Sequence, residues 1–147
     1  MKIRRFFAVA GVAALAGAGA VALPAAASAH TTSHTLTFIS LTKKSVMFTK
    51  TTGGQQNTDV NATGKIVGFD MLYFAATSAN SIAVNITGDF KGGFLYGTGT
   101  ANLKTGAFTN GKVTGGTGAF AGATGTIKAK ALNTAGTREA VTIIYST

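Results

Sequence analysis

The chain has 147 residues, with 13 lysines and arginines against 4 aspartates and glutamates, a formal net charge of +9 and no cysteine. The absence of cysteine excludes disulfide bonds, so hydrogen-bonded secondary structure and apolar packing must supply the stability. The basic residues are spread along the chain without a compact cluster of lysines and aromatic residues, which argues against a nucleic-acid-binding protein.

The first 29 residues have the layout of a secretory signal peptide. Three basic residues precede an apolar stretch over residues 6–23, and the small residues 27–29 form an A-x-A cleavage site. Cleavage after Ala29 would leave a secreted, extracellular single domain over residues 30–147, with ten basic and four acidic residues and a net charge of +6. The stretch is mostly alanine and glycine, a composition that looks bacterial and is too weakly hydrophobic for a retained anchor, so we expect no membrane association after cleavage.

Export by the general secretory route is the simpler expectation. The pair Arg4-Arg5 leaves a twin-arginine signal open as an alternative, although the residues around the pair fit that signal poorly.

The chain has two histidines, His30 and His34. Cleavage after Ala29 would make His30 the new amino terminus, where its α-amine and imidazole could bind copper with His34 as a third ligand. The segment HTTSH is more typical of a frayed tail, so we expect no metal and no cofactor. A serine or cysteine nucleophile paired with a histidine base is excluded, because no histidine follows residue 34.

Short alternating segments separated by turns predict an all-β domain. The expected strands number about eight and cover residues 36–41, 46–50, 65–75, 82–86, 94–103, a segment around Phe108, 126–132 and 140–145. Residues 51–59, TTGGQQNTD, are expected to form a polar loop without core content. Connections this short pair strands antiparallel, and closure into a barrel would remove the exposed edges.

The expected strand over residues 65–75 carries one acidic residue, Asp70, on the same face as Leu72 and Phe74. If that face points inward, Asp70 is a carboxylate in an apolar barrel and a candidate catalytic residue for acid–base chemistry. If it points outward, Asp70 is a solvated surface group. The alternation alone leaves both orientations open.

An eight-stranded barrel is either filled by its own side chains or wide enough for one small ligand. Numerous glycines and alanines on the candidate inward faces favour a residual cavity. Aromatic and amide side chains would line a hydrophobic pocket and orient a polar group of the ligand. The candidate ligand-binding residues are Tyr73, Phe74, Asn85, Phe94 and Tyr96.

Residues 111–132 join a glycine-dense turn to a clean strand pattern. The glycines can adopt positive φ angles or let another strand approach closely, and those expected to be structural are Gly115, Gly116, Gly118, Gly122 and Gly125. After them Ile127, Ala129 and Ala131 alternate with lysines, which predicts a strand with one dry face. The run lacks a Gly-Lys-Ser/Thr ending and no helix follows, so a phosphate-binding loop is disfavoured.

The run VTGGTGAFAGATGTIK at residues 113–128 resembles the glycine-rich motif of allene oxide cyclases and of plant dirigent proteins. GKIVG at residues 64–68, GDFKGG at residues 88–93 and the final segment 138–147 are similar to further motifs of that superfamily, in the same order. The resemblance implies an eight-stranded antiparallel β-barrel of the calycin-like allene oxide cyclase and dirigent type. It also implies an apolar cavity for a small organic molecule and a homo-oligomer, a trimer or dimer.

The catalytic residues of these families do not carry over. Ala121 and Thr124 stand where dirigent proteins have arginine, and residues 36–41 offer only serine and threonine where allene oxide cyclases use a glutamate. We therefore expect a secreted barrel that binds a small hydrophobic or phenolic molecule without catalysis. Two alternatives stay open: a cyclase or coupling-guide enzyme of this type, and a cell-surface structural or adhesive protein.

Overall fold

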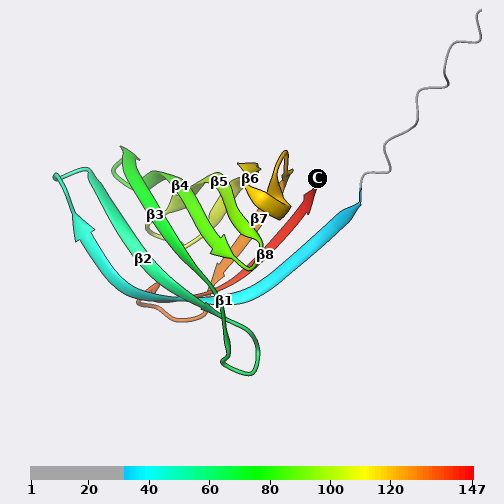
Figure 1. Ribbon diagram of the computed structural model, residues 1–147. Coiled ribbons are helices and arrows are strands. Elements are labelled where there is room, and N and C mark those ends of the chain that lie inside the picture. The colour runs from blue at the N-terminus through cyan, green and yellow to red at the C-terminus, as the bar shows by residue number, and fades with distance from the viewer. Residues whose placement is uncertain (1–31) are drawn as a thin grey trace, which may run out of the picture.

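The computed structural model describes residues 32–147, which form eight strands and one short 3-10 helix. The elements are β1 (Ser33–Met47), β2 (Thr52–Val60), β3 (Ile66–Ser78), β4 (Ser81–Phe90), β5 (Gly93–Asn102), β6 (Phe108–Gly116), η1 (Gly118–Phe120), β7 (Thr124–Ala131) and β8 (Arg138–Ser146). Each strand pairs antiparallel with the next, and β8 pairs with β1, so the sheet closes on itself (Figure 1). The predicted all-β, eight-stranded antiparallel barrel is confirmed.

The predicted signal peptide over residues 1–29 and the copper candidate His30 lie outside the described residues. Within residues 32–147, no helix is both long enough and apolar enough to cross a membrane.

The strand β2 corrects the prediction of a polar loop over residues 51–59. It pairs along its length with both β1 and β3. Its inner face is polar, because Gln55, Asn57 and Asp59 alternate toward the barrel interior. A strand with a polar inner face lacks the apolar alternation by which strands are usually recognised, although the period of two is present in these polar residues.

One end of the barrel is filled by an apolar core. The core residues are Phe38, Phe90, Leu95, Val113, Phe120, Ala123, Ile127, Val141, Ile143 and Tyr145. The 3-10 helix brings Phe120 into this core, where its ring centroid lies 6.3 Å from that of Phe90 and 5.4 Å from that of Tyr145. Ser33 and Ser146, near the outer ends of β1 and β8, pair at this same end. The barrel is therefore closed here by its own side chains.

The glycine-rich run connects β6, η1 and β7 at the closed end. Gly118 has a φ angle of 58°, a left-handed conformation that other residues rarely adopt. Gly125 has no room for a Cβ atom, which would meet the carbonyl oxygen of Ile144 on β8. The run thus lets the chain change direction between β6, η1 and β7 within a few residues, while β7 stays paired with β8.

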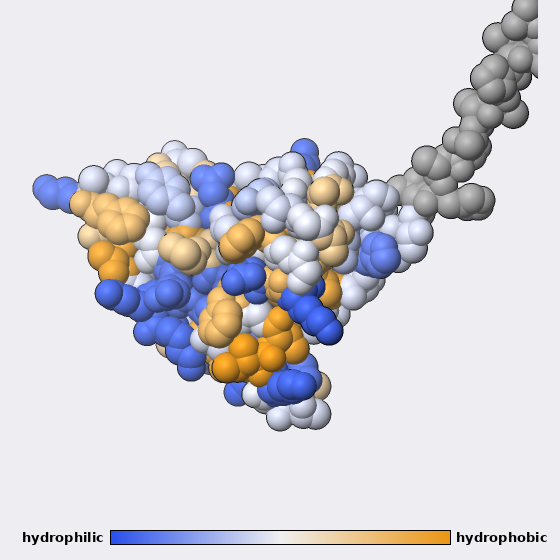
Figure 2. All heavy atoms as spheres, in the orientation of Figure 1, coloured by the Kyte–Doolittle hydropathy of each residue, from blue (hydrophilic) through white to orange (hydrophobic). Residues whose placement is uncertain are grey.

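Large hydrophobic side chains also reach the outer surface. Those on β3 and β5 are 37–62% exposed and comprise Ile66, Val67, Phe69, Met71, Tyr73, Phe94 and Tyr96. Figure 2 shows hydrophobic residues at the surface between hydrophilic ones on the face that it presents. The homo-oligomer implied by the family resemblance stays a prediction.

Candidate functional site

The barrel holds a cavity of about 420 Å³, and residues of the apolar core form part of its wall. Most of its wall is apolar and includes Phe38, Leu72, Phe74, Ile82, Val84, Ile86, Phe90, Leu95, Phe108, Ile127, Val141 and Ile143. The lining residues Met47 and Leu103 are 56% and 59% exposed and lie beside the β1–β2 and β5–β6 connections. The cavity therefore opens at the end of the barrel away from the core.

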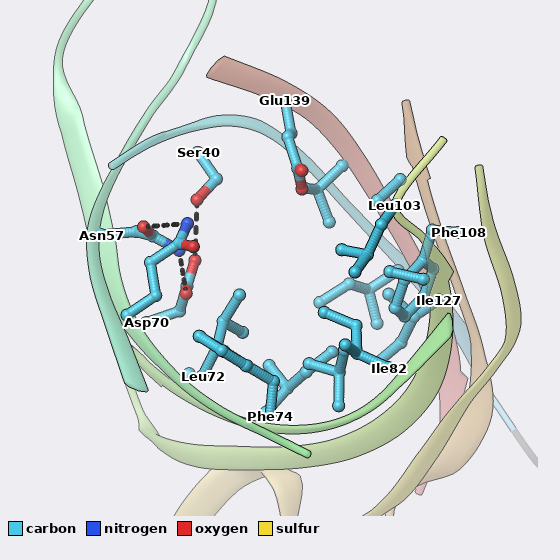
Figure 3. A pocket seen from close by; sticks show the side chains of 18 of the residues that line it. Ser40, Asn57, Asp70, Leu72, Phe74, Ile82, Leu103, Phe108, Ile127 and Glu139 are labelled. Atoms are coloured by element: carbon cyan, nitrogen blue, oxygen red, sulfur yellow. Dashed lines mark hydrogen bonds between the residues drawn. The ribbon is translucent and has the colours of Figure 1, made fainter. Parts of the chain in front are cut away.

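A polar network forms one side of the cavity, where β1, β2 and β3 run next to each other (Figure 3). Asp70 is 7% exposed, and both of its carboxylate oxygens accept a hydrogen bond. The Ser40 hydroxyl donates to Oδ2 at 2.9 Å, and the Asn57 side-chain amide donates to Oδ1 at 2.6 Å. The Gln55 amide in turn donates to Asn57 Oδ1 and to the Thr42 hydroxyl, at 3.0 and 2.7 Å. The orientation of Asp70 is thus held from two neighbouring strands.

A second carboxyl group, Asp59, lies beside this network. Asp59 sits opposite Ser40 in the β1–β2 register and opposite Gly68 in the β2–β3 register. Its side chain is 0% exposed, and neither carboxyl oxygen has a hydrogen-bond partner. Burial, and after it the negative charge of Asp70, raises the pKa of Asp59 to about 8. At neutral pH Asp59 therefore carries a proton.

Glu139 on β8 is a third carboxyl group of the site, and it lines the cavity as Asp70 does. Glu139 is opposite Ser40 in the β1–β8 register, and Figure 3 shows its carboxyl group pointing inward. Burial raises the pKa of Glu139, and the charge of Asp70 raises it further. This part of the barrel therefore holds three of the four acidic residues of the chain, which are Asp59, Asp70 and Glu139.

The structure places two of the predicted site residues in the cavity. Asp70 and Phe74 both line it, on the inward face of β3 that they share with Leu72. The sequence pattern left the orientation of this face open, and the structure shows that it points inward.

The other predicted ligand-binding residues do not line the cavity, and this corrects the prediction. Tyr73, Phe94, Tyr96 and Asn85 are exposed on the outer face of the barrel. The reason is the alternation of strands: Phe74 points inward, so its neighbour Tyr73 points outward, and Phe94 and Tyr96 flank the inward Leu95. Tyr73 and Asn85 instead line a shallow groove on the outside.

Five polar residues of the site had not been predicted: Ser40, Gln55, Asn57, Asp59 and Glu139. The assignment of residues 51–59 to a loop concealed three of them. Their signal was present as a polar alternation over residues 55–59 and as the rarity of acidic residues in a basic chain.

The remaining histidine lies at the closed end of the barrel. The ring of His34 stacks on Tyr145, with centroids 5.2 Å apart. Among residues 32–147, no three His, Cys, Asp or Glu side chains are grouped so that they could hold a metal ion.

The fold and its cavity define a closed, eight-stranded antiparallel β-barrel with an interior large enough for a small molecule. Among solved structures the chain is similar to a pyocyanin demethylase, with a TM-score of 0.62 and 18% sequence identity over 76% of this chain and 99% of that chain. No protein-family model matches the chain, and no curated protein does. At this identity the likeness shows the shared barrel fold alone, so the relationship to allene oxide cyclases and dirigent proteins stays a prediction.

Proposed function

We propose that this protein is secreted and that it binds a small, largely apolar molecule inside the barrel. The observation that carries the proposal is the cavity of about 420 Å³, a volume within the range of small-molecule sites. Such sites combine mostly apolar walls with a few fixed polar groups. A cell-surface structural or adhesive role, for which a filled barrel is expected, is disfavoured by this open volume.

The polar network would orient the bound molecule. Asp70 is the polar group held most firmly, because Ser40 and Asn57 each donate a hydrogen bond to it. A group that is already ordered before binding loses little conformational entropy when the ligand arrives. The ligand would therefore place its apolar part against β3–β7 and its polar part against Asp70. The similar solved barrel is named for an action on pyocyanin, which supports a small-molecule role for this fold.

An enzyme that moves protons on the bound molecule is the second candidate function. The observation that favours it is the pair of neighbouring carboxyl groups: burial keeps Asp59 protonated at neutral pH, while Asp70 accepts two hydrogen bonds. Two carboxyl groups in different protonation states are a recurring arrangement for acid–base catalysis. Asp70 would be the group next to the substrate, since it lines the cavity.

The substitution Ala101→Trp tests the binding proposal. Ala101 lines the cavity on β5 near its opening, so an indole there is expected to fill the space and to weaken binding of the neutral fluorescent probe N-phenyl-1-naphthylamine by about tenfold or more. Fluorescence titration of the mature protein measures the affinity. Thr100→Trp places the same ring on the opposite face of the same strand and is the matched control. A wild-type protein that does not bind the probe, or equal binding by both variants, would contradict the proposal.

A further inference from the structure

We infer that the cavity selects organic cations, molecules that carry a positively charged nitrogen on an apolar frame. This inference rests on the proposed function, because it names the ligand class of the same cavity. It follows from where the protein places its few negative charges and from which hydrogen-bonding groups the cavity wall leaves free.

The acidic residues are concentrated inside a protein that is otherwise basic. The chain has a net charge of +9, yet Asp59, Asp70 and Glu139 lie together in the barrel interior, and Asp89 is the acidic residue on the outer face. Lys50 is the basic residue among those that line the cavity, and it is exposed in the β1–β2 connection. Asp59 keeps its proton at neutral pH and adds no charge, so the negative charge of the polar wall is that of Asp70. The polar wall therefore presents the negative charge of Asp70, whose two hydrogen-bond donors, Ser40 and Asn57, are neutral.

Most hydrogen-bond donors of the polar wall are already used. The Ser40 hydroxyl and the Asn57 amide donate to Asp70, and the Gln55 amide donates to Thr42 and Asn57. The wall thus offers a ligand acceptor oxygens and negative charge. An anionic ligand, such as a fatty acid or a sulfonate, would meet like charge and few free donors at this wall, which is unfavourable in a buried site.

The buried carboxyl group of Asp59 lies beside Asp70 and keeps its proton at neutral pH. Its two oxygens are buried without a hydrogen bond, an arrangement that costs free energy in a protein interior. After burial, the charge of the adjacent Asp70 further raises the pKa of Asp59 and so helps to keep this proton in place. A cation seated against Asp70 would meet the carboxylate that faces the cavity, and an opposite charge within a few ångströms favours the ionised form.

The rest of the wall indicates an organic ligand rather than a hydrated inorganic ion. Four aromatic rings line the cavity, those of Phe38, Phe74, Phe90 and Phe108. The faces of such rings attract ammonium groups, and their apolar area suits a hydrocarbon frame. Carboxylates on one side and aromatic rings on the others are complementary to an apolar amine or quaternary ammonium compound.

A set of three probes of similar shape tests this selectivity. The cation is (1-naphthylmethyl)trimethylammonium, the neutral probe is its carbon isostere 1-neopentylnaphthalene, and the anion is 1-naphthylmethanesulfonate. Displacement of N-phenyl-1-naphthylamine from the mature protein at neutral pH gives their affinities. We expect the cation to bind about tenfold or more tightly than the isostere, and the anion to bind more weakly than both.

Three substitutions locate the source of the preference. Asp70→Asn keeps the shape of the side chain and is expected to reduce the preference for the cation about fivefold or more, while the isostere binds as before. Glu139→Gln is expected to reduce it in the same direction and serves as the second variant if Asp70→Asn folds poorly. Asp89→Asn removes the same charge from the outer face of β4 and is expected to leave all three affinities unchanged.

The outcomes separate this inference from the proposal on which it rests. Equal affinity for the cation and the isostere, or tighter binding of the anion, overturns the charge selectivity and leaves small-molecule binding intact. A cation preference that Asp89→Asn reduces as much as Asp70→Asn also overturns it, because the whole-protein charge would then be responsible. Failure of N-phenyl-1-naphthylamine and of all three probes to bind overturns both.

Discussion

Replacing Asp59 with asparagine is expected to stabilise the protein at pH 8, by on the order of 3 kcal/mol in the free energy of unfolding. The reason is that Asp59 is buried without a hydrogen-bond partner and has its pKa raised from 3.8 to about 8 in the folded protein. The unfolded chain loses this proton near pH 4, whereas the folded chain keeps it until about pH 8. The folded state binds the extra proton, so Asp59 lowers the stability progressively as the pH rises from 4 to 8.

Urea unfolding followed by circular dichroism at pH 4, 6 and 8 measures this effect. Asp59→Asn and the wild type are expected to be similarly stable at pH 4, because both carry a neutral side chain there, and to diverge as the pH rises. Asp89→Asn is the matched control, since Asp89 is exposed on β4. Curves for Asp59→Asn and the wild type that run parallel across the pH range would show that burial does not hold the proton on Asp59.

The substitution Gly125→Ala is expected to destabilise the barrel by about 3 kcal/mol or more, and to prevent folding if the strands cannot move apart. The new Cβ atom would meet the Ile144 carbonyl oxygen and lie 2.7 Å from the Cα atom of Tyr145. Both contacts are with the backbone of β8, which cannot yield as a flexible side chain can. Because β7 and β8 pair over eight residue positions, the clash falls within a long ladder that closes the barrel.

Gly122→Ala is the comparison, three residues earlier in the same turn. Gly122 has a φ angle of 74°, but no atom lies within 4 Å of the place that its Cβ would occupy. We expect a loss of about 1 kcal/mol, the ordinary cost of a left-handed conformation. Thermal unfolding of the two variants gives the difference. A loss at Gly125 no larger than the loss at Gly122 would mean that close approach to β8 is not what requires glycine at residue 125.

The barrel fold could be predicted from local patterns, because most of its strands have one apolar and one polar face. In β7 the alternation of Ile127, Ala129 and Ala131 with lysines correctly predicted a strand with one dry face: Ile127 is buried, and the lysines are exposed. The strand β2 could not be predicted from apolar alternation, and the reason is physical. Its inner face contacts other polar groups instead of the core, so hydrophobic periodicity carries no information about it.

The cavity-lining residues were harder to predict than the fold. Tyr73 and Phe74 are adjacent in sequence but lie on opposite sides of the sheet. An aromatic residue in a strand therefore cannot be assigned to the cavity until it is known which face of the strand points inward. The carboxyl cluster is harder still, since Asp59, Asp70 and Glu139 come from β2, β3 and β8. Barrel closure brings β8 beside β1, and no spacing along the chain encodes that contact.

The opening of the cavity and the two ends of the described chain lie at opposite ends of the barrel. Ser33 and Ser146 pair beside the closed core, whereas Met47 and Leu103 border the opening. A dye, an affinity tag or a solid support attached through either end would therefore stand at the end of the barrel opposite the opening. The protein is accordingly suited to immobilisation as a capture reagent, with its opening facing the solution.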